Sequence, residues 1–302
     1  MRVSWVTTPL AVALLLAGCG RTPNAAPVET PASSPDASVE TTPSVAPSSP
    51  VESSPPVEPS SPVEPVETPT PPPWLGTREL PLAANGFGEA RRTPPALRER
   101  AFTLPDTVEP LPGDGFASDV VAPAPQRVVA RSTWQPACPV GRDRLAWVRA
   151  AFRGFDGRRH TGELLLDRGV AADVVQVFDR LWRADFPLEE LRITRRDELD
   201  APPTGDGNNS GGFVCRPVVG GTTYSQHAYG LAVDLNPFQN PYTKGDVVLP
   251  ELASSYLDRD RRRPGMYDAD SVVVRAFAEI GWTWGGTWRT AQDRHHFSLT
   301  GG

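Results

Sequence analysis

Lysine is almost absent from this 302-residue sequence, in which Lys244 is the single example. Serine peptidases with a Ser-x-x-Lys motif need a lysine three residues after the nucleophile. The residue three positions before Lys244 is Pro241, so the sequence excludes that class of enzyme. There is no basic patch and the formal net charge is -6, so nothing in the composition predicts binding to nucleic acid.

Long hydrophobic runs are also missing. The apolar run at residues 10–17 is too short to span a bilayer as a stable helix. It ends in Leu-Ala-Gly-Cys at residues 16–19, which resembles the lipobox of bacterial lipoproteins. We therefore predict a lipoprotein signal peptide over residues 1–19, lipidation at Cys19, and export to the outer side of the bacterial cell membrane, facing the cell wall. The alternative is an ordinary secretory signal in which Cys19 is incidental.

Cysteine is scarce, with three in the chain. If Cys19 is lipidated, Cys138 and Cys215 remain as an even pair in an oxidising compartment, which predicts a disulfide between them. The rival interpretation makes Cys215 a metal-binding thiolate. It is weaker because no second cysteine lies at a short metal-binding spacing from Cys215.

Aromatic residues are absent from residues 20–73, which contain 16 prolines among Ser, Thr, Val and Glu. Such a segment buries too little apolar surface to offset the entropy of ordering it, so we predict a disordered, extended linker that acts as a tether. Residues 74–125 have scattered apolar residues without a sustained period and are predicted to form an irregular arm. The composition becomes globular over residues 126–302, where we predict a single folded domain.

For residues 126–302 we predict an α+β fold, a small antiparallel sheet with flanking helices. The spacing of apolar residues predicts helices over 143–152, 170–185 and 271–280. Strands are predicted over 162–166, 191–195, 231–235 and 295–299. A polar, glycine-rich loop is predicted over 201–212.

The stretch SQHAYGLAVD, residues 225–234, is the strongest functional pattern in the chain. Alternation along its second half places Leu231 and Val233 on one face of a strand and Asp234 on the other. A carboxylate on an otherwise apolar strand needs a partner. A metal ion that is also held by His227 would be such a partner; the alternative is an aspartate in a surface turn.

A catalytic zinc site normally has three protein ligands and one open position. The remaining histidines are His160, His295 and His296. In the C-terminal strand Phe297 and Leu299 are expected on the core face, which leaves His296 on the opposite face as the third ligand. His295 is expected to be a neighbour or an edge residue, and His160 a surface or loop-bonding residue.

A general base is also needed, to take a proton from water and deliver it to the leaving amine. Asp293 lies three residues before His296 and is the candidate. The alternative is that Asp293 forms a salt bridge with Arg289 or Arg294.

Two patterns together, Ser225-x-His227-x-x-Gly230-x-Ala232-x-Asp234 and Asp293-x-x-His296-Phe297, resemble the zinc D-alanyl-D-alanine carboxypeptidases of the VanY type, which include L-alanyl-D-glutamate endopeptidases. The resemblance implies a zinc enzyme that hydrolyses peptidoglycan stem peptides. It implies His227, Asp234 and His296 as zinc ligands and Asp293 as the catalytic carboxylate. Many relatives carry glutamate at the position of Asp293, so this chain has a shorter side chain there.

The same resemblance implies a role for Arg216 beside the substrate carbonyl or carboxylate, a task that suits a guanidinium fork. Ser225 is implied to orient the substrate or His227. The alternatives are a surface arginine and a capping serine. Trp284 and Trp288, which flank two glycines, are predicted to line the substrate cleft.

The bond that is cut stays open at this point. A carboxypeptidase would use Arg216 on a free C-terminal carboxylate, whereas an endopeptidase would use it on a carbonyl. A further alternative is a non-catalytic cell-wall-binding lipoprotein with a structural zinc, although such a protein would not need Asp293. We expect a monomer whose partners are stem peptides and, through Cys19, the membrane.

Overall fold

The computed structural model describes residues 69–218 and 221–301. The predicted signal peptide with Cys19, and the predicted linker as far as residue 68, lie outside these residues. Within the described part of the chain, no helix is long and apolar enough to cross a membrane.

Short elements make up the described chain. The α-helices are α1 (Gln126–Arg131), α2 (Ala171–Arg183) and α3 (Val272–Glu279). The strands are β1 (Ser118–Val121), β2 (Leu145–Gly154), β3 (Arg159–Asp167), β4 (Pro187–Leu188), β5 (Ala232–Asp234), β6 (Tyr242–Lys244), β7 (Val247–Leu249), β8 (Thr283–Trp284), β9 (Gln292–Asp293) and β10 (His296–Ser298). The 3-10 turns are η1 (Pro95–Leu97), η2 (Arg142–Arg144), η3 (Arg196–Glu198), η4 (Gln226–Tyr229), η5 (Ser254–Leu257) and η6 (Gly285–Thr287).

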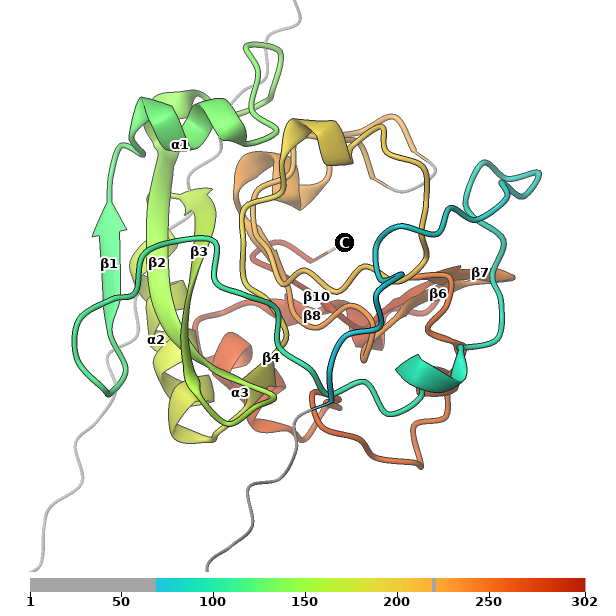
Figure 1. Ribbon diagram of the computed structural model, residues 1–302. Coiled ribbons are helices and arrows are strands. Elements are labelled where there is room, and N and C mark those ends of the chain that lie inside the picture. Colours follow the sequence, from blue (N-terminus) through green and yellow to red (C-terminus); the bar gives the residue numbers. More distant parts are fainter. Residues whose placement is uncertain (1–68, 219–220, 302) are drawn as a thin grey trace, which may run out of the picture. The chain divides into compact units, whose positions relative to one another are not determined.

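Among the described residues, the strands form three small sheets. The first has the antiparallel order β1-β2-β3, drawn side by side in Figure 1, and β4 pairs in parallel with the end of β2. The second has the order β5-β10-β8 and the third β7-β6-β9, and both are antiparallel. The predicted α+β fold with small antiparallel sheets is confirmed.

The predicted helix over 143–152 is wrong, because residues 145–152 lie in β2 and the two before them end η2. Alternate residues of β2 enter two different apolar clusters. Ala146 and Val148 belong to a cluster with α2 and α3, whereas Leu145 and Trp147 pack in a second cluster with Phe213. A strand that is covered on both faces has apolar residues at consecutive positions. Its sequence therefore lacks the alternation of apolar and polar residues by which a strand is recognised.

The two other predicted helices are confirmed as α2 and α3. The buried face of α2 carries Val174, Phe178 and Leu181, which recur at helical spacing. The helix α3 begins after Ser271, whose Oγ accepts a hydrogen bond from the backbone N–H of Val274 at 3.2 Å.

Three of the predicted strands are confirmed within β3, β5 and β10. The strand predicted over 191–195 is wrong. There, Leu191 forms an isolated bridge with Ser210, and the residues that follow lead into η3.

Part of the segment predicted as an irregular arm is built into the fold. It contains β1, and it buries Leu97 and Phe102 against Phe238 and Tyr256 in a third apolar cluster. The described residues belong to one compact unit by their internal contacts. The segment therefore belongs to the same compact unit as the residues that carry the motif.

Candidate active site

The motif at residues 225–234 folds as a turn followed by a strand. Ser225 precedes η4, and its Oγ accepts a hydrogen bond from the His227 N–H at 3.4 Å. Gly230 ends the turn with a φ of 71°, the left-handed region that favours glycine. A Cβ on Gly230 would lie 2.4 Å from the backbone nitrogen of Asp167, so no other residue fits without a shift of β3. The turn thereby aims His227 toward the strand β5 that follows it.

Strand pairing brings the two distant parts of the sequence pattern together. In the antiparallel pair of β5 and β10, His296 lies directly opposite Asp234, and Phe297 lies opposite Val233. Directly opposed residues project from the same face of a sheet. Phe297 is fully buried in the core, as the alternation predicted, whereas Leu299 is 39 % exposed and lies outside it. The expected face for His296 is correct even though the expected position of Leu299 is wrong.

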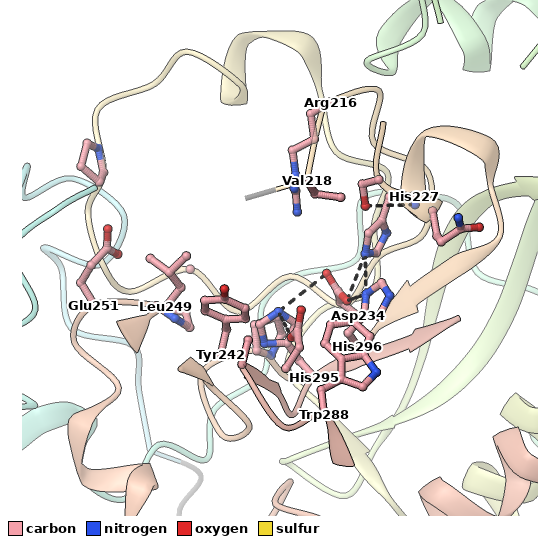
Figure 2. Close-up of a pocket in the computed structure, with 18 of the residues that line it drawn as sticks. Arg216, Val218, His227, Asp234, Tyr242, Leu249, Glu251, Trp288, His295 and His296 are labelled. Atoms are coloured by element: carbon pink, nitrogen blue, oxygen red, sulfur yellow. Dashed lines mark hydrogen bonds and ion pairs between the residues drawn. The ribbon is translucent and has the colours of Figure 1, made fainter. Parts of the chain in front are cut away.

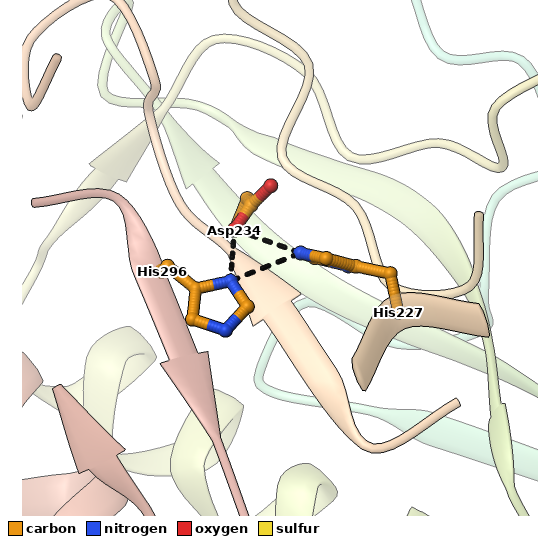
Figure 3. A group of neighbouring side chains, drawn as sticks. All are labelled: His227, Asp234 and His296. Carbon is orange, nitrogen blue, oxygen red and sulfur yellow. Dashed lines mark hydrogen bonds and ion pairs between the residues drawn. The ribbon is translucent and has the colours of Figure 1, made fainter. Parts of the chain in front are cut away.

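Three side-chain atoms form a nearly equilateral triangle (Figure 3). The distances are 3.0 Å from His227 Nε2 to His296 Nδ1, 3.2 Å from His227 Nε2 to Asp234 Oδ1, and 3.1 Å from His296 Nδ1 to Asp234 Oδ1. Two ring nitrogens and one carboxylate oxygen are donors that zinc accepts. In a tetrahedral zinc site with bonds of ~2.0–2.1 Å, two ligand atoms lie roughly 3.3–3.4 Å apart. The triangle therefore fits one face of such a site, and these residues could hold a metal ion.

Hydrogen bonding fixes the orientation of His227. Its Nδ1 lies 2.6 Å from the carbonyl oxygen of Gly212, so Nδ1 carries the proton and donates it. Nε2 is then left with a free lone pair, which points into the triangle. A metal-ligating histidine typically uses its second nitrogen in this way, on a backbone carbonyl or a carboxylate. His227 is thus pre-oriented as a ligand by a neighbouring loop.

Electrostatics in the triangle favours a charged carboxylate beside histidines. Burial works to raise the pKa of Asp234, but His227 and His295 in their protonated forms, with the contacts of its carboxylate to His227 and His296, lower it well below its ordinary value. Burial works to lower the pKa of His296, but its hydrogen bond to Asp234 and the charges of Asp234 and Asp293 raise it. The site therefore attracts positive charge, as a cation site must.

Asp293 lies in the wall of the same pocket. It ends β9, where it is paired with Tyr242 of β6. Its Oδ1 is buried and lies 3.0 Å from His295 Nε2, within ion-pair distance. The Nδ1 of His295 lies 3.0 Å from the carbonyl oxygen of Asn240. Asp293 thus faces His295, and neither predicted partner, Arg289 or Arg294, lies within ion-pair distance in the described chain.

One pocket of about 510 Å³ contains the triangle, a volume in the range of small-ligand sites. Arg216, Ser225 and Trp288 line it together with the triangle and Asp293 (Figure 2). The ring of Trp288 lies 5.5 Å from that of His296. Arg216 lies near enough for its charge to act on the pKa of His296, which it lowers.

Trp284, the other predicted cleft residue, does not line this pocket. It packs against the first apolar cluster, and its Nε1–H donates to the carbonyl oxygen of Arg294 at 2.7 Å. In β8 it is paired with Phe297, whose side chain is in the core. Pairing with a core residue turns Trp284 inward and away from the pocket.

The remaining histidine and the cysteines lie away from the triangle. His160 bonds Asp106 through Nδ1 at 2.8 Å and Asp156 through Nε2 at 3.1 Å, so it is the loop-bonding residue that was predicted. The predicted disulfide between Cys138 and Cys215 is present, with Cα atoms 5.9 Å apart. It excludes a thiolate role for Cys215 and fixes the chain next to Arg216.

The sequence analysis missed the far wall of the pocket, which includes Tyr242, Leu249 and Glu251. These residues come from the hairpin of β6 and β7 and the loop after it. No local period or spacing marks them as site residues. The one sequence feature that could have indicated these residues is that they follow the 225–234 motif closely in the chain.

Residues 219–299 match the family model described as D-alanyl-D-alanine carboxypeptidase. No match was found among curated proteins or among solved structures. The matched segment contains His227, Asp234 and His296, so the group that could hold a metal ion lies inside it. The resemblance predicted from the motifs is thus confirmed for this segment, which is similar to the D-alanyl-D-alanine carboxypeptidase family.

Proposed function

We propose that the protein is a zinc-dependent peptidase that hydrolyses peptidoglycan stem peptides in the manner of a D-alanyl-D-alanine carboxypeptidase. One observation carries the proposal: His227 Nε2, Asp234 Oδ1 and His296 Nδ1 converge at 3.0–3.2 Å in a pocket of the segment that matches the family. The donor set of two imidazoles and one carboxylate, with an open side toward the pocket, is typical of catalytic rather than structural zinc.

When bound, Zn²⁺ would act as a Lewis acid and would lower the pKa of the attacking water, so that the water is a better nucleophile near neutral pH. The residues of the chain perform the remaining tasks. Asp293 accepts a proton at its carboxylate from the attacking water and delivers it to the amine that leaves. Its place in the pocket wall supports this role, and His295, whose Nε2 lies 3.0 Å from Asp293 Oδ1, holds the carboxylate there.

Arg216 is proposed to bind the substrate carboxylate or carbonyl in the pocket. Its Nη1 donates to the carbonyl oxygen of Pro217 at 3.0 Å, which leaves the other guanidinium donors for a ligand. Ser225 holds the turn before His227, and Trp288 offers a flat apolar wall beside His296. The substrate would thus lie between the guanidinium group of Arg216 and the proposed metal ligands.

The proposal includes a location. The Leu-Ala-Gly-Cys pattern at residues 16–19 supports lipidation at Cys19, and the proline-rich composition of residues 20–73 supports a tether. A monomeric domain held outside the cell membrane in this way would reach the cell wall, where stem peptides are available. The anchor is tested by growing cells with a labelled fatty acid. The label should be incorporated covalently into the protein and should be absent from the Cys19→Ser variant.

The first experiment separates metal binding from proton transfer. Asp293→Ala should lower kcat roughly 10²- to 10⁴-fold while zinc content stays near one ion per chain. His227→Ala and His296→Ala should lower both zinc content and turnover. Asp246→Ala, which removes an exposed acid outside the pocket, serves as the matched control and should change neither. Unaltered turnover in Asp293→Ala would refute the assignment of the base.

The second experiment identifies the bond. Purified peptidoglycan is digested with and without a chelator, and the released fragments are analysed by mass spectrometry. Release of single D-alanine residues, abolished by the chelator, is expected for a carboxypeptidase. Release of larger peptide fragments would instead identify an endopeptidase, and an undiminished reaction in chelator would refute zinc dependence.

A further inference from the structure

The far wall of the pocket contains a nearly buried carboxylate without a cation. Glu251, which follows β7, is 7 % exposed and lines the pocket. Its Oε1 accepts a hydrogen bond from the backbone N–H of Gly88 at 3.0 Å. No arginine, lysine or histidine of the described chain lies within ion-pair distance of it. A carboxylate in this position lacks the partner that a buried charge normally has.

The chain holds Glu251 firmly in place. Besides the bond from Gly88, its backbone carbonyl accepts a hydrogen bond from the N–H of Arg91 at 3.0 Å. A Cβ on Gly88 would lie 2.6 Å from Glu251 Oε1, so the glycine leaves room for the carboxylate. Both contacts come from the segment at residues 74–125. A residue whose side chain and backbone are both held by a distant segment in this way is pre-organised for a ligand.

The position of Glu251 gives the pocket two unlike ends (Figure 2). Glu251 lies on the opposite side of the pocket from His227, Asp234 and His296, with Leu249 and Tyr242 between them. Arg216 lies nearer the metal ligands than Glu251 does. A substrate that spans the pocket therefore meets donors that suit an oxygen anion at one end and a carboxylate at the other.

We propose that Glu251 binds a primary ammonium group of the peptide substrate and so determines which peptides the pocket accepts. The inference rests on the proposed peptidase function and names the substrate class more closely. The ammonium would take the free oxygen of Glu251, Oε2, while Oε1 keeps its bond to Gly88. A charge-assisted bond of this kind is strongest where water is largely excluded, as it is around a side chain this deeply buried.

An ammonium group of a stem peptide has two sources. One is the α-ammonium at the N-terminus of a short peptide, and the other is the side-chain ammonium of a diamino acid. The chemistry that Glu251 recognises is the same in both cases. The experiment therefore varies the two groups independently.

Four peptides Lys-D-Ala-D-Ala are used as probes, with both amines free, with the α-amine acetylated, with the ε-amine acetylated, or with both acetylated. Their binding is measured by calorimetry on the zinc-loaded Asp293→Ala protein, with mass spectrometry afterwards to show that the peptides are intact. The same titrations are made with Glu251→Gln added, which keeps an acceptor for Gly88 but removes the charge. Because binding is read without turnover, failure of the wild-type protein to hydrolyse any peptide would refute the proposed function separately.

Acetylation of one amine should weaken binding roughly 10- to 100-fold, and Glu251→Gln should abolish that difference. Whichever acetylation has the effect identifies the α- or the side-chain ammonium. Gly88→Ala, which keeps the charge but displaces the carboxylate, should reduce the preference as well. Asp246→Asn removes an exposed charge outside the pocket and should leave it unchanged. Equal binding of all four peptides, no binding of any, or an equal effect of Asp246→Asn would overturn the proposal.

Discussion

Replacement of Arg100 by methionine should destabilise the protein strongly, because it breaks a fully buried ion pair. Arg100 Nε donates to Glu189 Oε2 at 2.7 Å and Nη2 donates to Oε1 at 2.5 Å. The side chains of Arg100 and Glu189 are 1 % and 0 % exposed. Nη1 of Arg100 also donates to the carbonyl oxygen of Asp206 at 2.7 Å. The pair thus joins the segment at residues 74–125 to the loop that contains Pro203 and Thr204 of the pocket wall.

The size of the effect follows from what remains after the substitution. Methionine keeps contact with the neighbouring ring of Phe238, which lies 4.4 Å from the guanidinium carbon, but Glu189 keeps only the bond from Asn208 at 2.8 Å. Removal of one partner of a buried pair typically costs about 3–5 kcal/mol in the free energy of unfolding. For a domain of this size that corresponds to a fall in Tm of roughly 6–20 °C.

The loss should also depend on pH. Burial raises the pKa of Glu189, and Arg100 opposes that rise. Without Arg100 the folded-state pKa lies higher still above the unfolded value. A folded state that binds the proton more tightly loses stability as pH rises from the unfolded pKa toward the folded one. The stability deficit of Arg100→Met should therefore be larger at pH 7 than at pH 5.

Urea unfolding followed by tryptophan fluorescence, carried out at pH 5 and at pH 7, measures the loss in the free energy of unfolding and its dependence on pH. The double variant Arg100→Met/Glu189→Gln removes the charge and should recover at least half of the loss, with no extra deficit at pH 7. Arg91→Met, which breaks a pair between side chains 50 % and 47 % exposed, is the control and should change stability by less than about 1 kcal/mol. A loss below about 1 kcal/mol in Arg100→Met, or an equal loss in the double variant, would contradict this reasoning.

Two further predictions concern residues away from the pocket. Hydrogen bonding to Asp106, opposed by burial and aided by Asp156, raises the pKa of His160, so its stabilising contribution is complete below the ordinary histidine pKa and is lost as pH rises through the raised value. Between pH 6 and 8 the free energy of unfolding, measured by urea titration, should therefore fall less with pH in His160→Gln than in the wild-type protein. An equal dependence on pH in the two proteins would contradict the role of His160. Replacement of Cys138 and Cys215 by serine should lower the free energy of unfolding by about 4 kcal/mol, because the disulfide closes a loop across 77 positions. An unchanged urea midpoint would show that the loop is restrained by other contacts.

The ligand-bearing part of the site could be predicted because local rules determine it. The alternation of Val233 and Asp234, and of Phe297 and His296, follows from the period of a strand, whatever the strand pairs with. Gly230 is required by a left-handed backbone and by contact with β3. These constraints act over a few residues, so a single sequence displays them.

The parts that sequence reasoning misjudged depend on what covers an element. β2 resembled a helix because both of its faces are buried, and only the tertiary structure supplies the second cover. Trp284 was expected in the cleft, but its pairing with Phe297 directs it to the core. Glu251 carries no local signal, since its place depends on Gly88, which lies 163 positions away.

The two ends of the pocket therefore have different structural origins. The end that carries the candidate metal ligands is built by η4, β5 and β10 within the segment that matches the family. The Glu251 end depends on Gly88 and Arg91, which precede that segment by more than a hundred residues. A change in the earlier segment could thus alter the choice of substrate while the three ligand atoms keep their places. Among the described residues, no strand pairing links Gly88 or Arg91 to β5 or β10, so we expect substitutions there to alter the proposed specificity without displacing His227, Asp234 or His296.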